Sequence, residues 1–278
     1  YNSLGSYAKS LHRALTDPYP PYEAIGIRDG EDYRQLSTSL LQIENEFYGT
    51  VRPKRRIERG ERPLHAMGER GVEYVEVRLM DLDPFAPVGI AADTMRFLDV
   101  FLLHCLLSDG PPDSPEEVAA ITLDRQRVAE SGRDTTLRLI ERGPGTTVRE
   151  RGSVLIEESA PIAAALDAAH GGASYRDALE AARAALVESS RVPSARMLRE
   201  MADSHANSYV QFARAQSILH RDKLLGLPFS REAQSRFANM ADESRAKQKS
   251  IEAADKMPFE TYRQQYIAQS LLGGPHLR

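Results

Sequence analysis

The sequence predicts an α+β protein in which an antiparallel sheet is followed by a mainly helical C-terminal region. Two observations support this prediction. Residues 41–48 and 71–79 alternate apolar and polar side chains with a period of two, which is typical of strands with one apolar face. Beyond residue 115, apolar residues recur instead with the spacing of helices over most of the chain.

A helix and a short hairpin are expected before the sheet. Ser3 is a candidate N-cap because its hydroxyl can accept a hydrogen bond from an unpaired backbone N–H, and residues 4–15 have helical apolar spacing. The proline-rich stretch 17–21 ends this helix, since proline neither donates a hydrogen bond nor continues the turn. Asp29-Gly30 then predicts a turn between two strand-like pieces within residues 25–36.

The second alternating stretch carries a charged pair on its polar side. Val75 and Val77 point one way, whereas Glu76 and Arg78 share the other face. Two residues apart on a strand, their side chains lie about 6–7 Å apart, so Glu76 could hold a hard cation while Arg78 reaches a phosphate or carboxylate. The alternative is an ion pair on an exposed sheet face, which contributes little stability. The residues alone leave both interpretations open.

The first alternating stretch places Tyr48 at its end, on the same side as Glu44 and Glu46. The tyrosine is interpreted either as part of a binding pocket or as a half-buried strand residue with its hydroxyl at the edge. The two glutamates are either metal or supporting carboxylates or simply partners in structural ion pairs, and structural pairing is the favoured interpretation.

Residues 52–70 are basic and contain Gly60, Pro63 and Gly68, so they are predicted to form a loop. Arg55 and Arg56 are interpreted as solvated surface cations. Arg52 follows the first strand directly and is a candidate contact to a nucleotide phosphate, with a surface cation as the alternative.

The remainder of the chain is expected to be helical. Residues 93–107 are apolar on nearly every side, which predicts a helix capped by Asp93 and buried against the sheet. Residues 109–115 are the candidate linker, so the predicted domains are a sheet domain over 1–108 and a helical region over 109–278. The further helices are expected at 116–130, 160–169, 175–187, 194–225, 231–255 and 258–272.

Composition excludes several classes of protein. The net charge of −4 gives no general affinity for polyanions, so nucleic acid is not an expected partner. No stretch reaches about 18 consecutive apolar residues, so a membrane span is not expected. The single cysteine, Cys105, excludes an intrachain disulfide framework and fits a reducing, cytoplasmic location, where it is expected to be a buried, inert thiol.

Two motifs resemble a known family. The runs LQIENEFYGTVRPKR (41–55) and GVEYVEVRLMDLDPFAPVGI (71–90) are similar to the bacterial glutamate–cysteine ligases, also called γ-glutamylcysteine synthetases. The similarity continues through residues 194–199 and 252–255. Members of this family are longer at the N-terminus, and this chain opens at Tyr1, so it is expected to be a C-terminal segment whose partner is the missing N-terminal half.

The resemblance implies a funnel-shaped antiparallel sheet like that of glutamine synthetase and an ATP- and Mg²⁺-dependent reaction. ATP, L-glutamate and L-cysteine would give γ-glutamylcysteine, ADP and phosphate through γ-glutamyl phosphate, the first step of glutathione biosynthesis. By matching positions, Glu76 corresponds to a magnesium ligand, Arg78 to the arginine at the transferred phosphate, and Tyr48 to a tyrosine of the cysteine pocket.

Two other functions are kept beside this one. The chain could be a non-catalytic C-terminal half that completes a separate N-terminal half, or a related carboxylate–amine ligase that uses another amine. The resemblance also places several acidic metal ligands before Tyr1, so the isolated chain is expected to be inactive.

Overall fold

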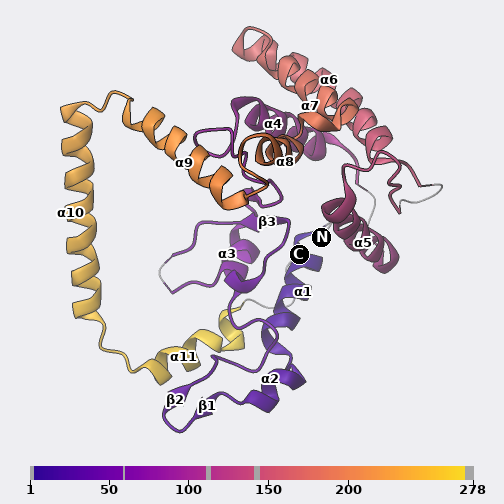
Figure 1. Ribbon diagram of the computed structural model, residues 1–278. Coiled ribbons are helices and arrows are strands. Elements are labelled where there is room, and N and C mark those ends of the chain that lie inside the picture. The colour runs from indigo at the N-terminus through magenta and orange to yellow at the C-terminus, as the bar shows by residue number, and fades with distance from the viewer. Residues whose placement is uncertain (1–2, 59, 111–113, 141–144, 273–278) are drawn as a thin grey trace. The chain divides into compact units, whose positions relative to one another are not determined.

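The computed structural model describes residues 3–58, 60–110, 114–140 and 145–272, and it confirms the α+β class (Figure 1). The chain divides into two compact units, one made of Tyr1–Met80 with Phe229–Arg278 and the other of Asp81–Pro228. This division differs from the predicted boundary at residue 108. Residues 111–113 of the expected linker lie outside the described residues.

The first unit is built around helix α1 (Leu4–Thr16), as the sequence predicted. The Ser3 hydroxyl accepts a hydrogen bond from the Ser6 backbone N–H at 3.1 Å, which confirms Ser3 as the N-cap. The short helix α2 (Pro20–Ile25) begins at the second and third prolines of this stretch. One face of α1 is buried in a core that gathers residues from both ends of the chain, namely Tyr7, Ala8, Leu11, Leu15, Leu64, Met67 and Leu272.

The expected hairpin is present as strands β1 (Arg28–Asp29) and β2 (Asp32–Tyr33), which pair antiparallel. Helix α11 (Phe259–Ile267), followed by the 3₁₀ turn η3 (Gln269–Leu271), packs against this hairpin (Figure 1). The Tyr33 hydroxyl donates to the Glu260 carboxylate, and Arg263 donates to the Leu36 carbonyl at 2.6 Å. These bonds place the last helix beside the start of the chain.

The predicted strand over residues 41–48 is wrong. Glu44–Glu46 form the 3₁₀ turn η1, and the strand begins later, as β3 (Val51–Lys54). The physical reason is that both glutamates serve the turn: Glu46 accepts a hydrogen bond from the Gln42 backbone N–H at 2.8 Å, and Glu44 is buried against Arg62. The second strand, β4 (Tyr74–Val77), is confirmed, and it pairs antiparallel with β3.

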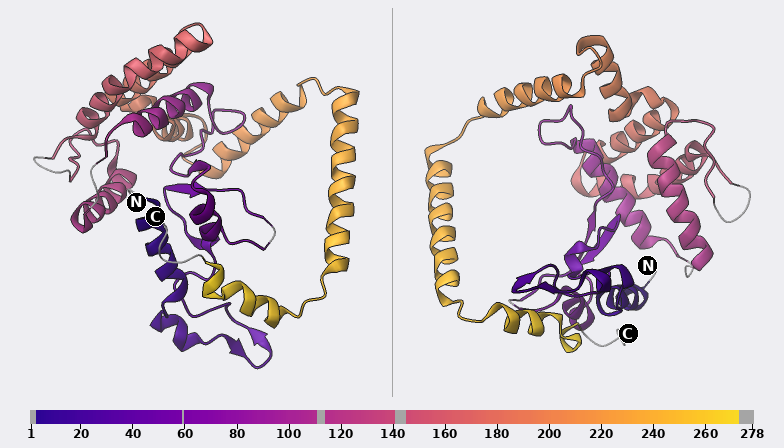
Figure 2. Two further views of the ribbon diagram at one scale, coloured as in Figure 1. Left: turned by 180° about the vertical axis from the view of Figure 1, so that it is seen from behind. Right: turned by 60° about the horizontal axis from the view of Figure 1, so that its bottom comes forward.

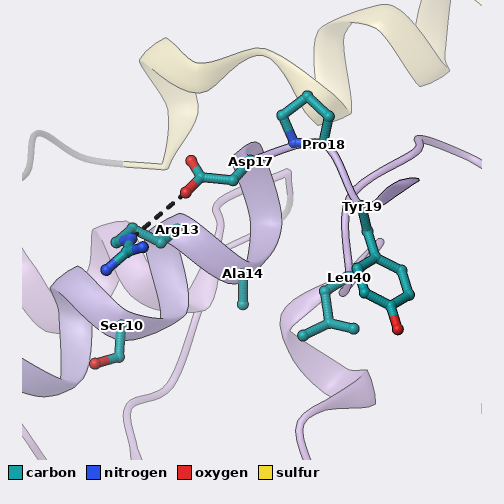
Figure 3. Close-up of a pocket in the computed structure, with 7 residues that line it drawn as sticks. All are labelled: Ser10, Arg13, Ala14, Asp17, Pro18, Tyr19 and Leu40. Carbon is teal, nitrogen blue, oxygen red and sulfur yellow. Dashed lines mark hydrogen bonds and ion pairs between the residues drawn. The ribbon is translucent and has the colours of Figure 1, made fainter. Parts of the chain in front are cut away.

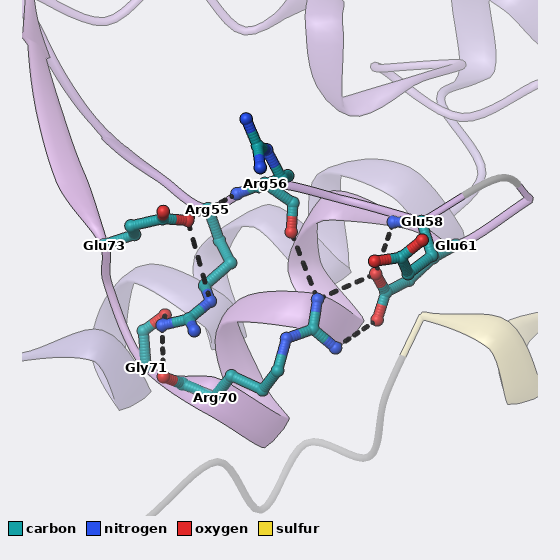
Figure 4. Close-up of polar contacts among 7 residues, drawn as sticks. All are labelled: Arg55, Arg56, Glu58, Glu61, Arg70, Gly71 and Glu73. Carbon is teal, nitrogen blue, oxygen red and sulfur yellow. Dashed lines mark hydrogen bonds and ion pairs between the residues drawn. The ribbon is translucent and has the colours of Figure 1, made fainter.

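The predicted loop over residues 52–70 is also wrong, because it contains most of β3 and the whole of helix α3 (Pro63–Arg70). Pro63 begins the helix, where its missing N–H costs nothing, and Gly71 ends it at a φ of 75°. The segment before α3 is held by Arg70, whose guanidinium donates to both Glu61 carboxylate oxygens at 2.7 and 2.8 Å (Figure 4).

Stability is expected to fall in acid because of the Glu61–Arg70 pair. The hydrogen bonds from Arg70 lower the pKa of Glu61 from 4.5 to about 2. A depressed carboxylate pKa adds stability that is complete above pH 4.5 and is lost as pH falls toward 2. Glu61→Gln should therefore destabilise the protein at pH 7, and the difference from wild type should shrink from pH 5 downward in urea unfolding series. A difference that does not change with pH would contradict this assignment.

The second unit is helical in its described part, with α4 (Ala92–Leu107), α6 (Val148–His170) and α7 (Ser174–Val187) packed together (Figure 2). Helix α4 packs on α6 and α7 around Val100 and Leu179, and its predicted burial against the sheet remains a prediction. Asp93 is not the N-cap but lies in the first turn. Helix α6 begins earlier than predicted and continues through Pro161.

The remaining helices follow the sequence pattern except at one position. These are α5 (Pro115–Ser131), the 3₁₀ turn η2 (Ser189–Arg191), α8 (Pro193–Ser204), α9 (Tyr209–Leu225) and α10 (Arg231–Ala254). A single helix was predicted over residues 194–225, but Ala206 and Asn207 have positive φ values of 48° and 58° and divide it. Within the described residues, none of the helices has the length and apolarity needed to span a membrane.

Cys105 is exposed near the end of α4, so the predicted burial of this thiol is wrong. Partial desolvation nevertheless raises the pKa of the thiol. A raised pKa lowers the thiolate fraction at neutral pH, so the expected low reactivity follows from desolvation rather than from full burial.

Candidate active site

The antiparallel ribbon of β3 and β4 determines which side chains share a face. Its register pairs Arg52 with Glu76 and Lys54 with Tyr74. Residues directly opposite each other in a sheet project to the same side, so these four polar side chains lie on one face of the ribbon. The other face is apolar and carries Val51, Pro53, Val75 and Val77.

Glu76 is held by two cations. Its Oε1 accepts a hydrogen bond from Arg78 Nε at 3.0 Å, and its Oε2 lies 3.3 Å from Lys54 Nζ. The bond from Arg78, followed by that from Lys54, lowers the pKa of Glu76, so the carboxylate is ionised at neutral pH. The side chain remains 34% exposed. Both carboxylate oxygens are thus engaged in ion pairs on the ribbon face, which is the structural alternative stated for Glu76 and Arg78, and the metal role of Glu76 remains a prediction.

Arg78 connects Glu76 to Tyr48. Its guanidinium carbon lies 5.2 Å from the centroid of the Tyr48 ring, within the range of a cation–π contact. Tyr48 itself is 79% exposed, so it is not the half-buried edge residue of the structural alternative. The structure thus brings together three of the four candidate residues, although Tyr48 lies after a 3₁₀ turn rather than at the end of a strand.

Arg52 shares this face of the ribbon, but its hydrogen bond goes to η1. It is only 5% exposed, and its Nη2 donates to the Glu44 backbone carbonyl at 3.1 Å. Its Nε has no hydrogen-bond partner among the described residues. In this arrangement Arg52 supports η1, and the phosphate contact expected of it remains a prediction.

The sequence predicted the role of Glu44 but not that of Lys54. Structural pairing of Glu44 is confirmed, since its carboxylate binds Arg62. Lys54 was missed as a partner of Glu76 because it fell in the predicted loop. The signal that could have found it is the period of two from Arg52, which continues the polar face of the ribbon.

The acidic residues do not form a metal site by themselves. Among the described residues, no group of three or more His, Cys, Asp or Glu side chains is arranged to hold a metal ion. The hard, ionised oxygens of Glu76 suit Mg²⁺, but they would supply only part of its coordination shell.

A pocket of about 350 Å³ lies elsewhere in the first unit (Figure 3). Arg13 and Asp17 of the α1 end form an exposed ion pair at its edge. None of the predicted site residues belongs to its lining, which consists of Ser10, Arg13, Ala14, Asp17, Pro18, Tyr19 and Leu40. The candidate site is therefore an open ribbon face and not this pocket.

Comparisons with known proteins agree with the motifs. A family model described as glutamate–cysteine ligase matches residues 1–128. The glutamate–cysteine ligase of Azotobacter vinelandii is 42% identical over 269 residues, covering 96% of this chain and 50% of the relative. That of Pseudomonas fluorescens is 39% identical over 271 residues, covering 98% and 51%.

A solved structure agrees as well. The glutamate–cysteine ligase of Francisella tularensis, in complex with AMP, superposes with a TM-score of 0.88 at 31% identity, covering 97% of this chain and 53% of that one. The fold and the ribbon motifs thus define a ligase-family protein. The chain belongs to the glutamate–cysteine ligase family. It spans about half the length of the curated relatives that it matches.

Proposed function

We propose that this chain is part of an enzyme that joins the γ-carboxyl group of L-glutamate to L-cysteine at the expense of ATP. The products would be γ-glutamylcysteine, ADP and phosphate, formed through γ-glutamyl phosphate as the first step of glutathione biosynthesis. The observation that carries the proposal is the contact of Arg78 with both Glu76 and Tyr48, on motifs shared with ligases of this family.

Arg78 is proposed to stabilise the phosphoryl group as it moves from ATP to the glutamate carboxylate. Its Nε is used for Glu76, which leaves the terminal Nη groups of the guanidinium to donate to phosphate oxygens. Glu76 fixes the orientation of this fork, and Lys54 adds a second positive charge beside it. AMP in the Francisella tularensis relative supports nucleotide binding in this family.

Glu76 is proposed to be one ligand of a catalytic Mg²⁺. The bound ion would neutralise negative charge on the phosphates during transfer. The part that belongs to this chain is the carboxylate, whose pKa is lowered and which is one-third exposed on the ribbon face. Lys54 and Arg78 would keep it ionised and oriented before the ion arrives.

A second half of the enzyme is proposed as the partner of this chain. The matched relatives are about twice as long, and the apolar face of the ribbon is open, with Val51 39% and Val75 46% exposed. A short ribbon with an exposed apolar face and unpaired edges favours addition of further strands. We therefore propose that the second half covers this face, supplies the other acidic ligands and makes the isolated chain inactive. The reaction would take place in the cytoplasm.

The phosphorylated intermediate is tested by oxygen transfer. The complete enzyme is supplied with ATP, cysteine and glutamate labelled with ¹⁸O in its γ-carboxylate. One labelled oxygen should appear in each phosphate released, because the carboxylate oxygen attacks the γ-phosphorus and leaves with phosphate when the cysteine amine attacks the carbonyl carbon. Unlabelled phosphate accompanied by labelled peptide product would contradict the intermediate.

A related ligase that uses another amine remains the second candidate, since the phosphate and metal parts of the site would be shared. Tyr48 is the observation that favours cysteine, because it matches the family tyrosine and its ring is exposed beside Arg78. Comparing kcat/KM for cysteine, 2-aminobutyrate, serine and glycine separates the two candidates. Cysteine should be preferred over every other amine.

Tyr48→Ala should selectively weaken the use of cysteine. Loss of one pocket contact costs about 1–3 kcal/mol, or roughly 10- to 200-fold in kcat/KM for cysteine. Thermal stability should hardly change, because the side chain is 79% exposed. Steady-state kinetics with each substrate varied in turn provides the measurement. Equal losses for cysteine, glutamate and ATP would assign Tyr48 to the general structure of the site.

A further inference from the structure

The most deeply buried ion pair in the described part of the chain joins Glu44 and Arg62, close in sequence to Tyr48 of the candidate site. Glu44 is 1% exposed and Arg62 is 2% exposed. Arg62 Nε donates to both carboxylate oxygens of Glu44, at 3.0 and 2.9 Å, and its Nη2 donates to Oε2 at 2.7 Å. This is a fixed, multiply bonded arrangement, unlike the exposed pairs elsewhere on the surface.

The same guanidinium also reaches the last helix of the first unit. Its carbon lies 4.1 Å from the centroid of the Tyr266 ring, and its Nη1 donates to the Tyr266 backbone carbonyl. Tyr266 belongs to α11, whereas Arg62 is the residue before α3 and Glu44 opens η1. One side chain therefore connects three segments that are far apart in the sequence.

The segment fixed by this ion pair, η1, lies two residues before Tyr48 of the candidate site. Tyr48 follows η1, and the residue between them, Phe47, makes an edge contact with Tyr7 of the core at 6.1 Å between ring centroids. On the far side of Tyr48, Arg52 returns to η1 and donates to the Glu44 carbonyl at 3.1 Å. Glu44 is thus bonded through its side chain by Arg62 and through its backbone by Arg52, and the intervening segment exposes Tyr48.

Stability alone does not account for this pair. Removing two charges from water costs several kcal/mol per ion, and apolar residues of similar volume often serve as well or better. What an apolar pair does not reproduce is direction, because a carboxylate bonded by two N–H groups of one guanidinium has a fixed orientation. The Glu44–Arg62 pair therefore fixes the position of residues 44–52.

We propose that Glu44 and Arg62, supported by Tyr266, are positioning residues for Tyr48 and hence for the cysteine side of the reaction. They fix the position of η1, and Tyr48, two residues after η1, makes the cation–π contact with Arg78. The kinetic part of this inference rests on the proposed function. The structural part does not, since the order of the segment 46–50 is measurable without substrate.

The test uses the complete enzyme and separates stability from positioning. The single variants Glu44→Gln and Arg62→Met should lower the Tm, because each leaves a buried polar group or charge without its partner. The double variant Glu44→Leu/Arg62→Met should recover most of the Tm. It should still lose at least about tenfold in kcat/KM for cysteine, a loss of the size expected for one pocket contact, while KM for ATP stays within about twofold.

Hydrogen exchange gives the readout that does not depend on activity. Backbone amides of residues 46–50 should exchange faster in the double variant than in wild type, with α1 amides unchanged. Glu61→Gln is the matched control, since it breaks an ion pair that reaches α3 but makes no bond to η1. That variant should leave both cysteine kinetics and exchange at residues 46–50 as in wild type.

Each outcome decides the proposal. Wild-type cysteine kinetics and wild-type exchange in the double variant would overturn it and reduce the pair to packing. If the double variant does not fold, Tyr266→Leu takes its place, because it removes the stacked ring and keeps the backbone acceptor; unchanged exchange at 46–50 there would overturn the proposal equally. A wild-type enzyme that makes no γ-glutamylcysteine would refute the proposed function instead. Hydrogen exchange at residues 46–50 would still test whether Glu44 and Arg62 position this segment.

Discussion

Replacing Glu76 by Gln should remove nearly all ligase activity of the complete enzyme while leaving the fold intact. A neutral amide is a poor ligand for Mg²⁺, which prefers charged, hard oxygens. The change also releases Arg78 and Lys54, both of which are oriented by the Glu76 carboxylate. Because the side chain is partly exposed, its replacement removes little packing, so the Tm should change only slightly.

The measurement is turnover as a function of Mg²⁺ concentration, accompanied by thermal unfolding. Glu73→Gln is a suitable control because Glu73 precedes β4 directly and binds Arg55 and the Arg56 backbone instead of the site residues. The control should retain activity. If Glu76→Gln turned over within about threefold of wild type at every Mg²⁺ concentration, a difference below 1 kcal/mol in barrier, the metal role of Glu76 would be lost.

Arg78→Lys should lower kcat much more than it raises KM for ATP. A guanidinium bridges two phosphate oxygens in a fixed fork while its Nε holds Glu76, whereas an ammonium offers one compact charge with a shorter reach. The contact tightens as charge develops on the transferring phosphoryl group, so its loss is felt mainly in the transition state. The substitution also removes the planar contact with the Tyr48 ring.

Single-turnover kinetics and nucleotide binding distinguish this role from simple affinity. Chemistry should slow in Arg78→Lys while the Kd for ATP changes little. Arg56→Lys, in the basic stretch 52–70 and with only its backbone atoms in the described contacts, should behave as wild type. An unchanged kcat with a raised Kd for ATP would mean that Arg78 binds the nucleotide without assisting the transfer.

The second strand was predictable because its signal is local. Residues 74–77 alternate valine with polar residues, and this alternation appears within the strand itself. The stretch 41–48 alternates equally well, yet its structure depends on Arg62, a residue 18 positions further on in a segment that was predicted to be a loop. Period two alone cannot distinguish a strand from a turn whose glutamate is buried by a distant arginine.

Which segments make up the first unit could not be predicted from the sequence for the same reason. Helix α11 joins the first unit through bonds such as Tyr33 to Glu260, which are 227 residues apart in the chain. Likewise, no Gly or Pro marks the break between α8 and α9, where Ala206 and Asn207 adopt positive φ. The candidate residues Tyr48, Glu76 and Arg78 were proposed from the motifs, whereas the contact of Lys54 with Glu76 needed the strand register.

The central claim is that this chain carries one part of a glutamate–cysteine ligase site, completed by a second half. The most direct measurement is the joint formation of γ-glutamylcysteine and phosphate from ATP, glutamate and cysteine. It is made on residues 1–278 alone, on the complete enzyme, and on residues 1–278 mixed with the second half. We expect no product from the chain alone, full turnover from the complete enzyme and partial turnover from the mixture. Cysteine-dependent turnover by the chain alone, or none by the complete enzyme, would contradict the claim.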